Sequence, residues 1–187
     1  MKIKASPHER SVVVELESRE ATLPPIAIPE IKLRKILVPV DFSESSRKAV
    51  QYAILFAKQF NAEILLLHVA EILPSPELVV AESGWLTAKL HEQADKELSE
   101  WREKIRPQME VKTTVQDGTP FWEIIRAADD NNMDLIILGT RGRTGLSRLF
   151  LGSTAERVVR HAPCPVMVVR EREHDFLAEE KGAVGKQ

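Results

Sequence analysis

The sequence predicts an α/β fold, an open five-stranded parallel sheet of the doubly wound, Rossmann-like kind. Short apolar runs such as Ile64–Val69 alternate along the chain with longer segments in which apolar residues recur every three or four positions. The apolar runs are nearly continuous, which is typical of parallel strands covered on both faces. A glycine-rich stretch, Gly139–Ser153, joins one such run to a helical segment, and in this arrangement backbone amides can gather around a phosphate group.

The composition narrows the class of protein. A formal net charge of -2 provides no overall attraction to nucleic acid or acidic membranes, so an anion site would have to arise from local geometry. The single cysteine, Cys164, excludes an intrachain disulfide and a cysteine-rich zinc site. No apolar run approaches the ~20 residues that span a bilayer, and the N-terminus lacks the apolar segment of a signal peptide. We therefore expect a cytoplasmic protein that binds neither nucleic acid nor membrane.

Three regions of the chain differ in character. Residues 1–33 contain a run that could pair as a short strand, Ser11–Leu16, followed by prolines at positions 24, 25 and 29 that interrupt regular structure. We interpret this region as an N-terminal extension that is mobile or draped over a surface. Residues 34–171 carry the periodic pattern and form the predicted domain. Residues 172–187 are a charged tail that we expect to be frayed.

The start of the domain predicts a strand, a helix and a second strand. The apolar run from Ile36 to Val40 tolerates Pro39 only because the strand ends there. Asp41 or Ser43 can then cap a helix in which apolar residues recur at helical spacing as far as position 60. A second buried strand over 64–69 follows after a short connection, so the two strands should be parallel and joined by a right-handed crossover.

The rest of the domain continues this alternation. The same reasoning predicts helices over 85–106, 121–130 and 153–162, and strands over 111–115, 135–138 and 166–169. We expect the sheet order 3-2-1-4-5, numbered along the chain, with the first strand beside the fourth.

This sheet order indicates a candidate site. In open sheets of this kind ligands bind beyond the carboxyl ends of the strands, where the strand order reverses, so Asp41 and Gly139 should meet there. Gly139 and Gly142 lack a Cβ and can let a ligand approach the backbone. Residues 152–154 open a helix whose free N–H groups and positive dipole end favour a phosphate.

A purely structural explanation competes with this interpretation. The glycines could form turns, and Ser153 with Glu156 three residues later could be an ordinary capping box. The stretch lacks the GK[ST] ending of a Walker A motif, and it follows a late strand, unlike the dinucleotide fingerprint. Arg141 and Arg143 lie within it, and their guanidinium groups could pair with phosphate oxygens.

Several motifs together resemble one family. Gly139, Gly142, Gly152 and Ser153 match the spacing GxxG-x9-G[ST] of the ATP-binding branch of the universal stress protein family. The stretches KILVPVDFSESSRKAV, ILLLHVAE, DGTPFWEII, DLIILGTRG and APCPVMVVR also resemble that family and follow its order, over about residues 34–171. The resemblance implies the fold of the adenine nucleotide alpha hydrolase-like proteins.

The resemblance also implies a site for an adenine nucleotide. It assigns Asp41 and the backbone of Val69 to the adenosine end, and Pro39 and Val40 to the walls of the adenine pocket. Capping of the following helix is the alternative role of Asp41. The residues that would line the ribose and phosphates are Gly139, Thr140, Gly142, Gly152, Ser153 and Thr154. The implied ligand is ATP, or AMP or ADP in its place, with Mg²⁺ or Mn²⁺ bound through the phosphates and no metal site of the protein's own.

The remaining polar and aromatic residues favour structural roles. His68 lies inside an apolar strand, where a hydrogen-bonded core histidine is the expected role. Cys164 lies between two prolines and is interpreted as a small buried residue, because nothing nearby would activate its thiol. The three tryptophans, Trp85, Trp101 and Trp122, are interpreted as core or interface residues.

The sequence favours binding over catalysis. Phosphoryl transfer needs a positioned base, and Asp41 would lie at the nucleoside end with no second carboxylate clearly placed near Ser153. We therefore expect no catalytic residue, little intrinsic hydrolysis and a nucleotide-responsive stress or signalling module. Two alternatives stay open: an adenine-nucleotide hydrolase or transferase of the related superfamily, and a nucleotide-independent interaction protein. The resemblance and the edge strand Val166–Val169 together predict a homodimer, with an unknown protein partner.

Overall fold

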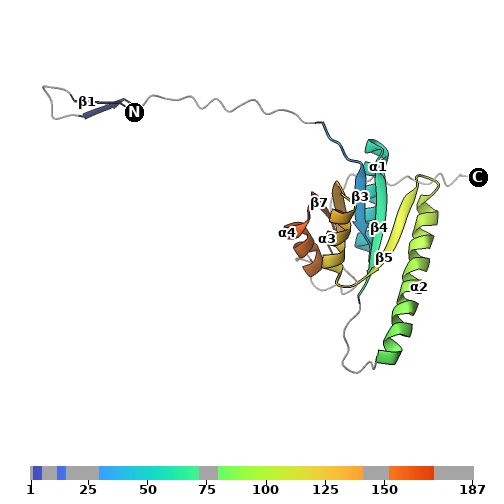
Figure 1. Ribbon diagram of the computed structural model, residues 1–187. Helices are drawn as coiled ribbons and strands as arrows, with labels where there is room; N and C mark the ends of the chain where they lie inside the picture. Colours follow the sequence, from blue (N-terminus) through green and yellow to red (C-terminus); the bar gives the residue numbers. More distant parts are fainter. Residues whose placement is uncertain (1, 6–11, 16–29, 72–79, 141–151, 171–187) are drawn as a thin grey trace, which may run out of the picture. The chain divides into compact units, whose positions relative to one another are not determined.

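The computed structural model describes residues 2–5, 12–15, 30–71, 80–140 and 152–170. The chain forms two compact units, Met1–Ile31 and Lys32–Gln187. In the first unit, β1 (Lys2–Ala5) and β2 (Val12–Glu15) pair as antiparallel strands (Figure 1). The second strand of this pair falls within Ser11–Leu16, the run predicted to pair as a short strand.

The second unit is built on a parallel sheet of five strands. In chain order these are β3 (Lys35–Pro39), β4 (Glu63–Ala70), β5 (Val111–Asp117), β6 (Leu135–Gly139) and β7 (Val166–Val169). Their order across the sheet is β5-β4-β3-β6-β7, and every neighbouring pair is parallel. Counted within this sheet, that order is 3-2-1-4-5, so the predicted fold class and topology are confirmed.

Two helices cover each face of the sheet. One face packs against α1 (Glu44–Phe60) and α2 (Val80–Ile105), and the other against α3 (Pro120–Asp130) and α4 (Ser153–His161). Figure 1 shows α2 on one side of the sheet and α3 and α4 on the other. The order of the strands explains this division. The chain moves across the sheet in one direction from β3 to β5 and in the other from β5 to β7, and right-handed crossovers in opposite directions place their helices on opposite faces.

Alternation along the central strands explains their continuous apolar sequence. In β3, Ile36 and Val38 belong to the core beneath α1 and α2, whereas Leu37 belongs to the core beneath α3 and α4. In β6 the same alternation separates Ile137 from Ile136. Both faces are covered, so both sets of side chains must be apolar to be buried without loss of hydrogen bonds.

The helix boundaries differ from the predicted ones mainly at α2. This helix begins at Val80, five residues before the predicted Trp85. Of the two roles predicted for the tryptophans, core or interface, the core role is wrong for Trp85 and Trp122, which are 66% and 59% exposed, and the interface role stays a prediction for them. Trp101, by contrast, packs against the core beside Phe42. Helical periodicity locates an apolar face, but it does not show how far along the helix the sheet extends.

Cys164 offers a test of burial at the α4–β7 connection. This residue is half-buried, and desolvation, with a smaller contribution from the charge of Asp134, raises the pKa of its thiol. The thiolate is the reactive form, so the raised pKa lowers the fraction of Cys164 that is thiolate near neutral pH. Alkylation by iodoacetamide near pH 8 should therefore be slower in the folded protein than in urea-unfolded protein. Its rate should keep rising above the ordinary thiol midpoint of about 8.5. Equal rates for the two states would contradict this prediction.

Candidate functional site

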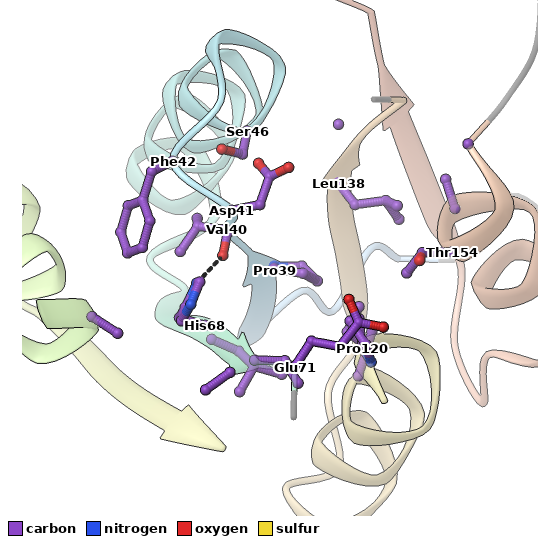
Figure 2. Close-up of a pocket in the computed structure, with 18 of the residues that line it drawn as sticks. Pro39, Val40, Asp41, Phe42, Ser46, His68, Glu71, Pro120, Leu138 and Thr154 are labelled. Atoms are coloured by element: carbon purple, nitrogen blue, oxygen red, sulfur yellow. Dashed lines mark hydrogen bonds between the residues drawn. The ribbon is translucent and has the colours of Figure 1, made fainter. Parts of the chain in front are cut away.

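A pocket of about 680 Å³ lies beyond the carboxyl ends of the strands (Figure 2). All the predicted site residues that the structure describes line it: Pro39, Val40, Asp41, Val69, Gly139, Thr140, Gly152, Ser153 and Thr154. The predictions for Arg141 and Gly142 lie outside the described residues. The volume falls within the roughly 300–1,000 Å³ of small-molecule and cofactor sites. Segments separated by about a hundred residues of sequence thus converge on one concave surface.

The pocket opens because β3 and β6 separate. They pair only at Ile36 with Leu135 and at Leu37 with Ile136, although both strands continue further. Val40 donates its N–H to Leu67 of β4 at 2.8 Å, so Val38 and Val40 direct their backbone groups toward β4. Pro39 therefore faces β6, but it has no N–H to donate. The proline that ends the strand also ends the ladder, and the gap that follows is the crevice at the reversal of strand order.

Gly139 makes room for the start of α1. A Cβ at this position would lie 2.6 Å from Ser45 Oγ and 2.8 Å from the Ser45 carbonyl carbon. Ser45 is itself buried, so the helix cannot easily move away. The absence of a side chain at Gly139 thus serves the close approach of α1 and β6. Sequence reasoning attributed it to the approach of a ligand.

Gly152 and Thr140 join the two ends of the stretch between β6 and α4. The Gly152 N–H donates to the Thr140 carbonyl at 2.9 Å, and the Thr140 N–H donates to Val169 at 2.8 Å. Gly152 is the N-cap of α4 and supplies no side-chain hydrogen bond, so the capping box headed by Ser153, the competing structural explanation, does not form. The first N–H groups of a helix have no partner within it. The N–H groups of Ser153 and Thr154 lie at the pocket, where the positive end of the helix dipole would stabilise an anion.

Asp41 is oriented by the turn that begins α1. Its Oδ1 accepts the Ser43 N–H at 3.1 Å and the Ser43 hydroxyl at 2.6 Å. Ser43 is the N-cap of α1 and in turn accepts the Ser46 N–H. Between them, Phe42 has a φ of 64°, a left-handed conformation that is costly for a bulky residue and recurs at functional sites. Ser43, rather than Asp41, caps the helix, and no described residue bonds to the second carboxylate oxygen of Asp41.

Beside His68, the backbone of Val69 lies beyond the end of β3. The Nδ1 of His68 lies 2.8 Å from the Val40 carbonyl oxygen, and its ring stacks on Phe42 with centroids 4.7 Å apart. Leu67 directs its carbonyl toward β3, so Val69, two residues later, also directs its backbone groups to that side. There β3 has ended and the Val40 oxygen is occupied by His68. No described residue on that side bonds to the Val69 backbone, so its N–H and carbonyl are available beside the pocket.

Sequence reasoning missed several lining residues. Phe42, His68, Ala70 and Glu71 lie within two residues of predicted positions along the chain, so proximity to a strand end was a usable signal, whereas Ser46 comes from the first turn of α1. Leu90, Gln93, Ala94 and Glu97 come from α2, and Pro120 and Ile124 from α3. Their positions depend on how each crossover helix packs, which local periodicity does not specify. His68 is hydrogen-bonded as expected, but it is half-buried at the pocket and not enclosed in the core.

The described lining is acidic. It includes Asp41, Glu71 and Glu97, and no lysine or arginine occurs among its described residues. Within the described ranges, no three His, Cys, Asp or Glu side chains gather to form a metal site. None of the helices in that part of the chain combines the length and apolarity needed to cross a membrane.

Most of the chain resembles known proteins in sequence. A family model described as the universal stress protein family matches residues 32–170. The chain belongs to this family. As a universal stress protein it is 39% identical to MJ0531 of Methanocaldococcus jannaschii over 141 residues, which cover 74% of this chain and 82% of that protein. The solved structure of the universal stress protein UspA from Lactobacillus plantarum superposes with a TM-score of 0.69 and 29% identity. That match covers 75% of this chain and all of the other.

Two less similar universal stress proteins have been solved with adenine nucleotides. One, from Archaeoglobus fulgidus, is in complex with dAMP (TM-score 0.51, 74% of this chain and 99% of the other). The second is in complex with cAMP (TM-score 0.53, 76% and 100%). Both are 20% identical to this universal stress protein, so their likeness shows the shared fold.

Proposed function

We propose that this universal stress protein binds ATP, or AMP or ADP in its place, and acts as a nucleotide-responsive stress or signalling module. The observation that carries the proposal is the convergence of three kinds of group on one pocket. These are a preoriented carboxylate at Asp41, free backbone groups at Val69 and the uncapped start of α4 at Gly152. A nucleotide needs all three, because it combines hydroxyls, a flat base and phosphates. The adenine nucleotides held by two proteins of the same fold support this ligand class.

The pocket suggests how the nucleotide would lie. Its phosphates would accept hydrogen bonds from the N–H groups and hydroxyls of Ser153 and Thr154, where the helix dipole favours negative charge. Its base would rest against Pro39 and Val40 and meet the backbone of Val69. Asp41 would accept a hydrogen bond from the adenosine end. Mg²⁺ or Mn²⁺ would bind through the phosphates, which are the hard oxygen ligands these ions prefer.

We expect binding with little hydrolysis. Hydrolysis requires a group that positions or deprotonates the attacking water. Asp41 would be engaged at the nucleoside end. The alternative function, an adenine-nucleotide hydrolase, is favoured by one observation, because Glu71 adds a carboxylate to the lining that sequence reasoning missed. A sensitive assay for ADP, AMP or pyrophosphate release separates the two functions, since a module that only binds should release none above the spontaneous rate.

The binding proposal has a direct test. The purified protein is denatured, any released small molecule is identified by mass spectrometry, and the nucleotide-free protein is then titrated with ATP and AMP by calorimetry. We expect a released adenine nucleotide or saturable binding of one. If neither is found, the nucleotide assignment is wrong, and the third candidate, a nucleotide-independent interaction protein, is favoured.

We also propose a homodimer through the outer edge of β7. This strand lies at one end of the sheet order. The carbonyl of Pro165, just before β7, accepts the Ile136 N–H at 3.0 Å, and the carbonyl of Val169 accepts the N–H of Thr140, just after β6, at 2.8 Å. Alternate residues therefore direct their backbone groups outward, and Val168 is one of them. Edge strands with unpaired backbone groups readily pair with another chain.

Substitution of one outward-facing residue tests the dimer. Val168→Pro removes an outward N–H without removing a bond to β6, so we expect a dimer to become a monomer in light scattering coupled to size-exclusion chromatography. Val168→Ala is the matched control, because it shortens the side chain and keeps the N–H. A Val168→Pro protein that remains dimeric would show that the interface lies elsewhere.

A further inference from the structure

The pocket continues onto the face of the sheet that α2 covers. We call this part the α2-side lobe and define it by Phe42, His68, Leu90, Gln93, Ala94 and Glu97. His68 follows Leu66 by two residues in β4 and so lies on the same face as that core residue, beneath α1 and α2. Figure 2 shows Phe42 and His68 on the side of Val40 that faces α2, with Pro120 and Thr154 on the other. The α2-side lobe thus adjoins the region assigned to the nucleotide at Val40 and lies on the other side of that residue from Pro120 and Thr154.

Its most specific feature is the ring of His68. The Val40 carbonyl oxygen, 2.8 Å from Nδ1, can only accept a hydrogen bond, so Nδ1 must carry the proton. The neutral ring then has its lone pair on Nε2. No described residue donates a hydrogen bond to that atom. Stacking on Phe42 fixes the plane of the ring, and the edge of Phe42 meets Trp101 with ring centroids 5.6 Å apart. The α2-side lobe therefore contains a fixed, unused hydrogen-bond acceptor.

The surrounding residues favour a cation over an anion. Glu97 accepts the side-chain N–H of Gln93 at 3.0 Å through Oε1, which leaves its Oε2 available. Ala94 is buried, and Leu90, although 41% exposed, completes an apolar wall. No lysine or arginine occurs in the described lining to attract a phosphate or carboxylate. A flat group between apolar walls, with N–H donors for His68 Nε2 and the Glu97 carboxylate, matches this chemistry.

We propose that the α2-side lobe is a second binding site, which takes a small molecule carrying a planar cationic N–H donor, an amidinium or guanidinium group. The group would donate one hydrogen bond to His68 Nε2 and another to Glu97. This site does not depend on the nucleotide, because none of the groups that bind the cation is assigned to the nucleotide.

The experiment uses a matched pair of probes, benzamidine and benzoate, which share a shape and differ in charge and in the capacity to donate. In a nuclear magnetic resonance titration of the full chain, benzamidine should bind saturably and shift the Nε2 resonance of His68. Its affinity should exceed that of benzoate by about tenfold or more, the effect of a hydrogen bond to a charged group. His68→Phe keeps a flat ring without the acceptor and should weaken benzamidine by a similar factor. His161→Phe is the control. It lies on α4, outside the pocket lining, and should leave the affinity for benzamidine unchanged.

Two outcomes would overturn the proposal. The first is equal binding of both probes, or of benzamidine to the wild-type and His68→Phe proteins. The second needs no variant: ¹⁵N resonances that place the proton of His68 on Nε2 would remove the acceptor on which the site depends. The ATP titration tests the nucleotide site separately. If benzamidine binds and ATP does not, the nucleotide assignment is wrong and the α2-side lobe is still supported. If ATP binds and benzamidine does not, only the α2-side lobe is wrong.

Discussion

Replacing Gly139 with valine should lower the free energy of unfolding by about 3 kcal/mol or prevent folding, because overpacking at an enclosed position costs about 1–3 kcal/mol or more. The added Cβ would lie 2.6 Å from the Ser45 hydroxyl and 2.8 Å from its backbone, and the backbone at a helix start cannot rotate away. The measurement is urea unfolding followed by circular dichroism.

A control separates steric conflict from the effect of valine itself. Gln59→Val places the same side chain on the exposed surface of α1, the helix that Gly139 contacts. This substitution should lower the free energy of unfolding by only about 0.5 kcal/mol, because a β-branched residue has a lower helix propensity than glutamine. If Gly139→Val unfolds at the same urea concentration as the wild type, the close approach of α1 and β6 is not what requires glycine here.

Replacing Asp41 with alanine should weaken ATP binding about 10- to 100-fold, since a hydrogen bond to a charged group contributes about 1.5–3 kcal/mol. The same change removes the acceptor for the Ser43 N–H and hydroxyl and should cost about 1 kcal/mol of stability, in the range of a lost capping interaction. Calorimetric titration and urea unfolding measure the two effects.

The conservative variant separates the two roles of Asp41. Asp41→Asn keeps an oxygen for Ser43 but presents an amide NH₂ where the second carboxylate oxygen would face the proposed ligand. We therefore expect wild-type stability with most of the loss in ATP affinity. An Asp41→Asn protein that binds ATP as tightly as the wild type would show that Asp41 serves only the turn.

The turn at Phe42 illustrates a feature that the sequence did not reveal. The residues DFS suggested a helix start, and Ser43 does cap α1. The left-handed conformation of Phe42 results from several contacts acting together. Ser43 bonds to Asp41 on one side of the residue, and the Phe42 ring is held between His68 and Trp101. Residues in such a conformation persist only where the surroundings over-determine them, and two of these three contacts, those with His68 and Trp101, come from distant segments.

Much of this universal stress protein could be predicted from local sequence. The continuous apolar runs predicted the parallel strands, and the helical spacing predicted α1, α3 and α4 close to their observed bounds, because burial on a face or a stripe must repeat with the period of the element. Pro39 marked the end of β3, since its missing N–H cannot serve a ladder. Each of these inferences depends on residues within one element, and for that reason each was accessible without the fold.

The pocket also depends on contacts between elements. Gly139 must be glycine because Ser45 lies against it. The tautomer of His68 is set by its hydrogen bond to Val40, and the α2-side lobe forms only where α2 leaves the sheet. No sequence period records such contacts, because they depend on the distance and angle between packed elements and not on the repeat within one. The sequence was therefore sufficient to place a pocket at the carboxyl ends of the strands. The tertiary structure was needed to show which atoms in it are free to bind, since an atom is free only when no neighbour from elsewhere in the chain already occupies it.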